Sequence, residues 1–144
     1  MPEPRTWSGE FYEGSNFLLL ALAVGLDQAA LVQADLSASS DVHVDLFDRT
    51  TGSSTPVFSV DDTSTDTDVN PDSVPFMSNT LQTGYGWPDT TGFNFMYNVV
   101  NSTWTTPSVG GHLYACEVSL DPAGASKNGV VYIKWELRCL PVKT

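Results

Sequence analysis

The sequence predicts an all-β protein, an antiparallel β-sandwich of eight or nine strands. Apolar and polar residues alternate with a period of two through much of the second half of the chain. Clusters rich in Gly, Pro, Ser and Thr separate the alternating runs, and no helical period is sustained. Short, regularly spaced strands of this kind are typical of two packed sheets. A length of 144 residues suits a single core.

The clearest strand lies at residues 92–99. Its aromatic and aliphatic residues share one face, and the residues between them form the other: Phe93, Phe95, Tyr97 and Val99 against Asn94, Met96 and Asn98. The same alternation predicts strands at residues 41–48, 112–120 and 130–140. Each of these runs is therefore expected to bury one face and expose the other.

The first third of the chain is less regular. Residues 17–24 and 29–36 are rich in Leu and Ala, which favours helix by propensity. Both are short and end at turn signals, so they are predicted as buried strands. Runs at 6–12 and 56–60 complete the set. We expect residues 1–15 to form an N-terminal arm and residues 16–144 to form one sandwich domain.

The charge balance restricts the function. Six Lys and Arg stand against 17 Asp and Glu, a net charge of −11. Clustered cations are needed to bind phosphates or anionic membrane surfaces, so neither nucleic acid nor membrane is expected as a partner. Charged residues make up 16% of the chain, and Ser and Thr supply much of the remaining polarity. A hydroxyl-rich surface loses less hydration energy when a partner covers it, as in an assembled subunit.

The apolar run at residues 17–24 is shorter than the roughly 20 residues of a spanning helix. Its flanks are acidic, unlike the basic start of a secretory signal. We therefore expect buried core and synthesis in the cytoplasm. Cys116 and Cys139 lie in phase with the apolar faces of their strands, which predicts buried, reduced thiols. In that compartment the sequon at Asn101 has no consequence.

Residues 61–72 are strongly acidic, with Asp66, Asp68 and Asn70 on alternate positions. A calcium loop of the helix-flanked type needs Gly at its sixth position and Glu at its twelfth. Pro71 and Met77 occupy those places, and the flanks are typical of strands. The segment is therefore interpreted as a solvated acidic connection. No metal and no cofactor are predicted.

Only His43 and His112 are available as bases near neutral pH. His43 is expected to point outward beside Asp45, and His112 follows two glycines at a strand start. No nucleophile elbow, phosphate loop or zinc-binding pair of histidines is present. We predict no catalytic residue, and the chain is not expected to be an enzyme.

Aromatic residues outside the alternating runs are the candidates for binding. Tyr85 and Trp87 lie in a loop at residues 83–89, and such rings either anchor a partner or fold back onto the domain. Trp104 is expected to cover the end of the sandwich. Trp7, Phe11 and Tyr12 give the N-terminal arm the composition of a segment that docks on a neighbour. The predicted partner-binding residues are Trp7, Phe11, Tyr12, Tyr85 and Trp87.

The order of features in residues 30–140 resembles the small immunoglobulin-like β-sandwiches of tailed bacteriophages. The resemblance rests on the order of strands and turns and on Gly110-Gly111, Tyr114 and Val118, which lead into the penultimate strand. It implies an immunoglobulin-like or jelly-roll fold. It also implies a virion structural protein, above all a capsid decoration (cement) protein made in the host cytoplasm. The implied partners are the major capsid protein or another virion protein, together with further copies of the chain, for example as trimers.

Two other functions remain open at this point. A carbohydrate-binding module would use Tyr85, Trp87 and Trp104 as a stacking platform. A tail or baseplate adaptor would differ from a decoration protein in copy number rather than in chemistry.

Overall fold

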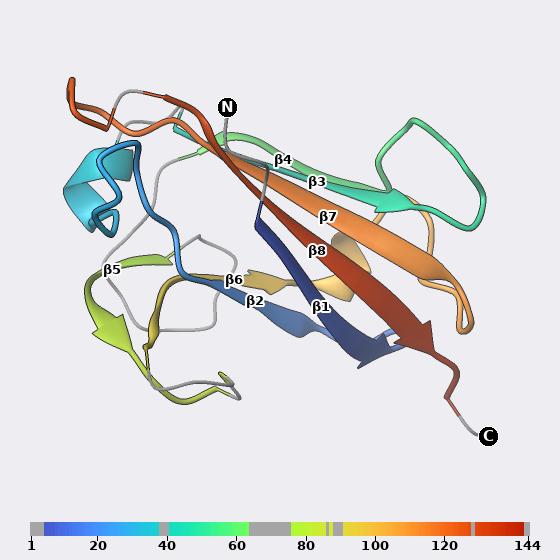
Figure 1. Ribbon diagram of the computed structural model, residues 1–144. Coiled ribbons are helices and arrows are strands. Elements are labelled where there is room, and N and C mark those ends of the chain that lie inside the picture. The colour runs from blue at the N-terminus through green and yellow to red at the C-terminus, as the bar shows by residue number, and fades with distance from the viewer. Residues whose placement is uncertain are drawn as a thin grey trace.

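The computed structural model describes residues 5–37, 41–63, 76–85, 87, 91–127 and 129–142. These residues form a β-sandwich, with no α-helix in the described ranges (Figure 1). Eight strands make a five-stranded and a three-stranded sheet. In chain order they are β1 (Arg5–Tyr12), β2 (Phe17–Ala21), β3 (Val42–Asp48), β4 (Phe58–Thr63), β5 (Phe76–Gln82), β6 (Phe93–Val99), β7 (Leu113–Leu120) and β8 (Val131–Leu140). The predicted all-β sandwich is confirmed.

The strand order distinguishes between the two predicted sandwich types. The larger sheet has the order β1-β8-β7-β3-β4 and the smaller one β2-β6-β5. From β8 to β4 this is the G-F-C-C′ order of immunoglobulin variable domains, and the smaller sheet matches B-E-D. Within each sheet the pairs are antiparallel except that β1 runs parallel to β8. The topology is therefore immunoglobulin-like, with one parallel pair that the sequence did not indicate.

A tyrosine corner supports this assignment. The Tyr114 hydroxyl, near the start of β7, accepts a hydrogen bond of 3.0 Å from the Val109 N–H. Immunoglobulin sandwiches have such a tyrosine two residues before the second cysteine of their disulfide. Cys116 occupies that cysteine position here, but β2 contains no cysteine and Cys116 is free.

The N-terminal segment differs from the prediction. The strand predicted at residues 6–12 is present as Arg5–Tyr12. Residues 1–15 were expected to form an arm outside the sandwich domain, but this strand is an edge strand of the larger sheet. The alternation of the strand explains this, because Phe11 points inward and is buried in the core. Burial of that ring favours docking of the segment on its own sandwich.

The segment after β2 is also different. The predicted strand at 17–24 ends at Ala21, and residues 29–36 form an isolated bridge and a 3-10 helix at Gln33–Leu36 instead of a strand. The buried Asn94 side chain explains this. Its amide accepts a hydrogen bond from the Ala23 N–H and donates to the carbonyls of Ala23 and Leu31. These backbone groups are thus paired without a neighbouring strand.

Strand β5 (Phe76–Gln82) was not predicted, because its residues do not alternate. It is an edge strand whose register with β6 shifts between Met77 and Gln82. Pairing with β6 therefore defines the strand, rather than the pattern of its own side chains.

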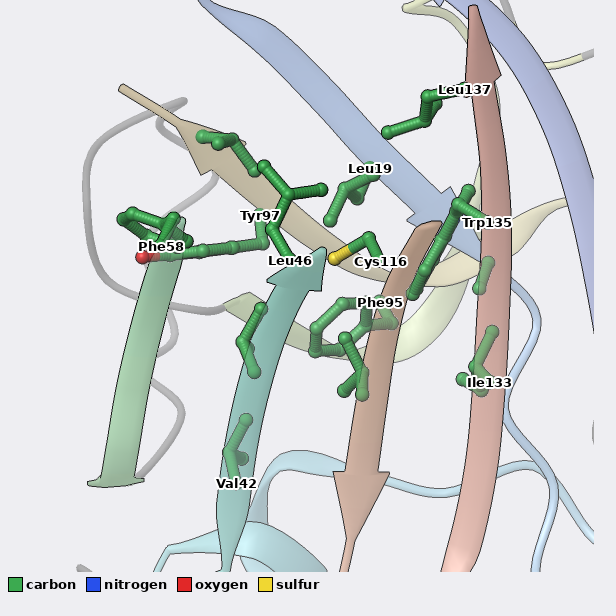
Figure 2. Close-up of a cluster of buried hydrophobic side chains, with 14 of the residues drawn as sticks. Leu19, Val42, Leu46, Phe58, Phe95, Tyr97, Cys116, Ile133, Trp135 and Leu137 are labelled. Carbon is green, nitrogen blue, oxygen red and sulfur yellow. The ribbon is translucent and has the colours of Figure 1, made fainter. Parts of the chain in front are cut away.

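The core lies between the two sheets, and Figure 2 shows Leu19, Leu46, Phe95, Cys116 and Trp135 within it. Strand β3 alternates strictly between core and outer positions, as predicted. Both cysteines are buried and free, which confirms the prediction of unpaired thiols. Burial raises the pKa of the Cys116 thiol above its ordinary value, so the thiolate is disfavoured in the folded protein.

Candidate partner-binding site

A groove of about 220 Å³ lies along one open side of the sandwich. Most of its lining residues come from β1, the outermost strand of the larger sheet, and from β2, an outermost strand of the smaller one. Aromatic residues from separate parts of the chain line it, together with β1 backbone: Trp7, Ser8, Gly9, Glu10, Phe17, Leu18, Leu20, Tyr85, Trp87, Trp135 and Leu137. We refer to it below as the edge groove.

The edge groove brings together three of the five predicted binding residues. The rings of Trp7 and Trp87 are 4.8 Å apart, although 80 residues separate them in the chain. Trp87 also packs on Phe93, with ring centroids 5.7 Å apart, and Tyr85 lies over the same ring at 6.3 Å. Both indoles are half-buried. For Trp87 the ring therefore folds back onto the domain while keeping one side on the groove.

The loop that carries Tyr85 is strained. Tyr85 has a φ of 52°, in the left-handed region, and the preceding Gly84 has a φ of 107°. The Trp87 N–H closes the turn on the Gly84 carbonyl at 2.9 Å. A left-handed conformation costs a residue with a side chain about 1–2 kcal/mol. Tyr85 is 50% exposed, so this strained turn places the residue at the surface.

Trp135 closes the floor of the edge groove and joins the two sheets. It lies on β8, and its indole N–H donates to the Leu20 carbonyl on β2 at 3.2 Å. This bond links the two sheets beside the groove, and β1 contributes Trp7, Ser8, Gly9 and Glu10 to the lining.

The other two predicted residues lie elsewhere. Phe11 is buried in the core against Phe17, Trp104 and Tyr114, so its side chain is inaccessible to a partner. The prediction for Phe11 is wrong because the arm is a strand with an inward face. Tyr12 is exposed on the opposite, outer face of β1.

Sequence reasoning missed a second depression on that outer face. It has a volume of about 560 Å³ and shares Ser8, Gly9, Glu10 and Leu137 with the edge groove. Arg49 and Arg138 line it, two of the chain's six basic residues. The remaining lining residues are Leu113, Tyr114, Ala115 and Glu136. The central Gly9 in the run at residues 6–12 was the available signal, because a strand glycine often marks close approach by another group.

Each of the two histidines lies beside a carboxylate. His43 Nε2 lies 2.8 Å from Asp45 Oδ2, as the outward alternation predicted, and Ser59 Oγ donates to the other oxygen of Asp45. The Asp45 carboxylate thus lies between the imidazole and the hydroxyl, with one oxygen toward each. A nucleophilic serine would instead have to donate to the histidine.

His112 Nδ1 lies 2.8 Å from Asp48 Oδ2. The other oxygen of Asp48 accepts the backbone N–H groups of Thr50 and Thr51, so this carboxylate holds the turn after β3. His112 is half-buried, less open than the strand-start position suggested.

No group of three or more potential metal ligands occurs in the described ranges. The predicted acidic connection at residues 61–72 lies, from residue 64 onward, outside those ranges. Likewise, within the described part of the chain no helix is long and apolar enough to cross a membrane.

Trp104 does not belong to the edge groove. It is 8% exposed, and its ring packs on Phe11, Phe17 and Tyr114 at one end of the core. This agrees with the predicted role of covering the end of the sandwich. A stacking platform made of Tyr85, Trp87 and Trp104 is therefore not present.

No protein family, curated protein or solved structure was found to match this chain.

Proposed function

We propose that this chain is a non-enzymatic virion structural protein, a phage capsid decoration protein that stabilises the head by bridging capsid subunits. Its main support is the edge groove, where aromatic rings and open strand backbone lie together at the surface. Aromatic anchors of this kind contribute strongly to protein–protein interfaces. The proposed partners are the major capsid protein, or another virion protein, and further copies of the chain.

The composition of the surface fits this role. A net charge of −11 with few cations keeps finished particles apart, while hydroxyl-rich surface is buried at low cost. An interface of standard size buries about 1,600 Å², and many copies on one particle add their contributions. The work done is mechanical: each contact raises the free energy needed to separate two subunits.

The alternatives are less well supported. A carbohydrate-binding platform loses one of its three rings, because Trp104 is buried. A tail or baseplate adaptor would use the same contacts, and only the location and copy number on the particle separate it from a decoration protein.

The location can be tested by gold-labelled antibodies against this chain on particles of the phage that encodes it. Dense labelling of heads is expected. Labelling confined to tails would favour the adaptor, and the absence of label from particles would contradict a virion role.

The contact site can be tested on the same particles. Particles assembled with Tyr85→Ala or Trp87→Ala protein should release DNA at a lower temperature than wild-type particles. Tyr132→Ala is the matched control, because Tyr132 is 51% exposed but lies outside the edge groove. An equal effect of all three substitutions would contradict the assignment of the contact.

A further inference from the structure

The outer edge of β1 is open. Among the described strands, β8 is the only partner of β1. The Glu13 N–H continues their ladder by donating to the Leu140 carbonyl at 2.9 Å. Backbone groups of alternate residues point to the same side of a strand. The N–H and C=O groups of Gly9 therefore face β8, and those of Ser8 and Glu10 face away from it. An edge strand with such groups is a template for pairing with another strand.

A gap lies beneath this edge, on the core side. Gly9 occupies an inward position between Trp7 and Phe11 and contributes no side chain. A Cβ at Gly9 would meet only Leu137 Cδ2, at 3.7 Å, which is ordinary van der Waals contact. The gap is part of the edge groove. With about 220 Å³, the groove is smaller than the roughly 300 Å³ at which small-molecule pockets begin. Its size suits one or two apolar side chains.

Among the described side chains, the charged residue that β1 itself turns to the outer face is an acid, Glu10, whereas Arg138 and Arg49 lie one or more strands away from the open edge. Side chains of β1 alternate, so Ser8 and Glu10 point to the outer face. Glu10 stands opposite Arg138 on β8, and Ser8 stands opposite Glu136. A strand added to β1 would place its own outer side chains beside Ser8 and Glu10. Opposite charges in such cross-strand positions stabilise a sheet, and the net charge of −11 acts in the same direction.

We propose that the open edge of β1 binds an extended segment of a partner protein by strand addition, a segment in which apolar and basic residues alternate. Its apolar side chains enter the edge groove, its basic side chains lie beside Glu10, and its backbone pairs with Ser8 and Glu10. The proposal specifies the chemistry of the partner segment at the edge groove, and it therefore rests on the proposed function.

A second copy of the chain is a poorer occupant. Its β1 would bring another Glu10 toward the first. The inward residues Trp7 and Phe11 of that copy already pack against its own sandwich. The described part of its edge therefore offers no free apolar side chain for the groove.

Peptides of eight residues, the length of β1, provide the probe. A labelled peptide of alternating Leu and Lys should bind the wild-type protein, by fluorescence anisotropy, at least about tenfold more tightly than one of alternating Leu and Glu. N-methylation of alternate residues in the phase that faces β1 should weaken binding by a similar factor, because it removes the pairing N–H groups. The other phase should bind like the unmodified peptide. Equal affinity of the Lys and Glu peptides, or of the two phases, would overturn the proposal.

Three variants test the edge itself. Gly9→Val fills the groove with a residue that suits strands, and Ser8→Pro removes an N–H from the open edge while leaving the ladder to β8 intact. Each should reduce the affinity for the Leu–Lys peptide at least about tenfold. Ser8→Ala keeps the N–H and should bind like the wild type. If Gly9→Val fails to fold, the comparison of Ser8→Pro with Ser8→Ala decides. Identical binding by these two would contradict strand addition.

The same proteins separate this inference from the proposed function. Particle binding that Ser8→Pro leaves intact would contradict strand addition and leave the decoration role standing. If the protein binds the peptide but is absent from particles, strand addition stands and the decoration role is contradicted. A dimer of the free protein that Ser8→Pro converts to a monomer would make a second copy the occupant and overturn the proposal.

Discussion

Phe11 and Tyr12 are neighbours in β1, yet Phe11 is 4% exposed and Tyr12 is 59% exposed. The Phe11 ring lies 4.4 Å from that of Phe17 and 5.7 Å from that of Tyr114, measured between centroids. The aromatic side chains of one N-terminal strand thus serve two purposes, one in the core and one on the outer surface.

Alanine substitutions at these two positions should differ sharply. Phe11→Ala should lower the free energy of unfolding by about 3–5 kcal/mol, because it leaves a cavity between the sheets. Tyr12→Ala should change it by no more than about 0.5 kcal/mol. Urea denaturation of both variants measures the difference. Similar small losses would mean that β1 is not docked on the core.

The tyrosine corner gives a second prediction. Tyr114→Phe removes the acceptor of the Val109 N–H and should destabilise the fold by about 1–2 kcal/mol. Tyr97→Phe is the control. Tyr97 is a second buried tyrosine, and its hydroxyl has no recorded hydrogen bond to the described residues. The melting temperature of Tyr114→Phe should therefore lie clearly below that of Tyr97→Phe. A larger loss of stability for Tyr97→Phe would contradict the assigned role of Tyr114.

Asn94 should be among the least replaceable polar residues. Asn94→Ala leaves the Ala23 N–H and the Leu31 carbonyl without their side-chain partner in a buried site, with an expected loss of about 3 kcal/mol or more. The Ala23 carbonyl keeps its hydrogen bond from the Leu31 N–H. Asn94→Asp retains an acceptor but loses both donated bonds and buries a charge, so it should not rescue stability. Amide hydrogen exchange at Ala23 should rise in Asn94→Ala, where the Ala23 N–H loses its acceptor. Unchanged protection there would show that the segment is held by other contacts.

Glu13 should make the stability depend on acid pH. Hydrogen bonds from the backbone N–H groups of Val142 and Gly110 lower the pKa of Glu13 below its ordinary value of 4.5. Because the folded pKa is the lower one, this contribution is complete above pH 4.5 and is lost as the pH falls toward the folded pKa.

The comparison with Glu13→Gln isolates this effect. The wild type should be the more stable protein near neutral pH, and the difference should shrink as the pH falls below about 4.5. Denaturant unfolding at a series of pH values measures it. A difference that grows on acidification would have the wrong sign for a carboxylate held by N–H donors.

The sequence was most informative where side chains alternate. Strands β3, β6, β7 and β8 coincide closely with the predicted runs, because a strand with a core-facing side places apolar residues at every second position. Strand β6 was expected to expose its other face, but Asn94 and Met96 on that face are buried as well. The edge strand β5 has no such pattern, and its pairing with β6 defines it. The segment around Ala23 and Leu31 was mistaken for strand, because the partner of its backbone is the side chain of Asn94, 63 or more residues away.

The candidate site, too, was partly predictable from the sequence. Its rings could be named from the sequence, because Trp7, Tyr85 and Trp87 are aromatic residues outside regular apolar runs. The pairing of β1 with β8 decides the rest, and it joins segments from opposite ends of the sequence. Because β1 pairs with β8 in parallel, Trp7 meets Trp87 and Phe11 turns into the core. Local sequence determined which segments are strands and which faces they bury. Only the tertiary structure decided which strand edges stay open and which rings lie beside them, because edges and grooves arise from the packing of segments that are distant in the sequence.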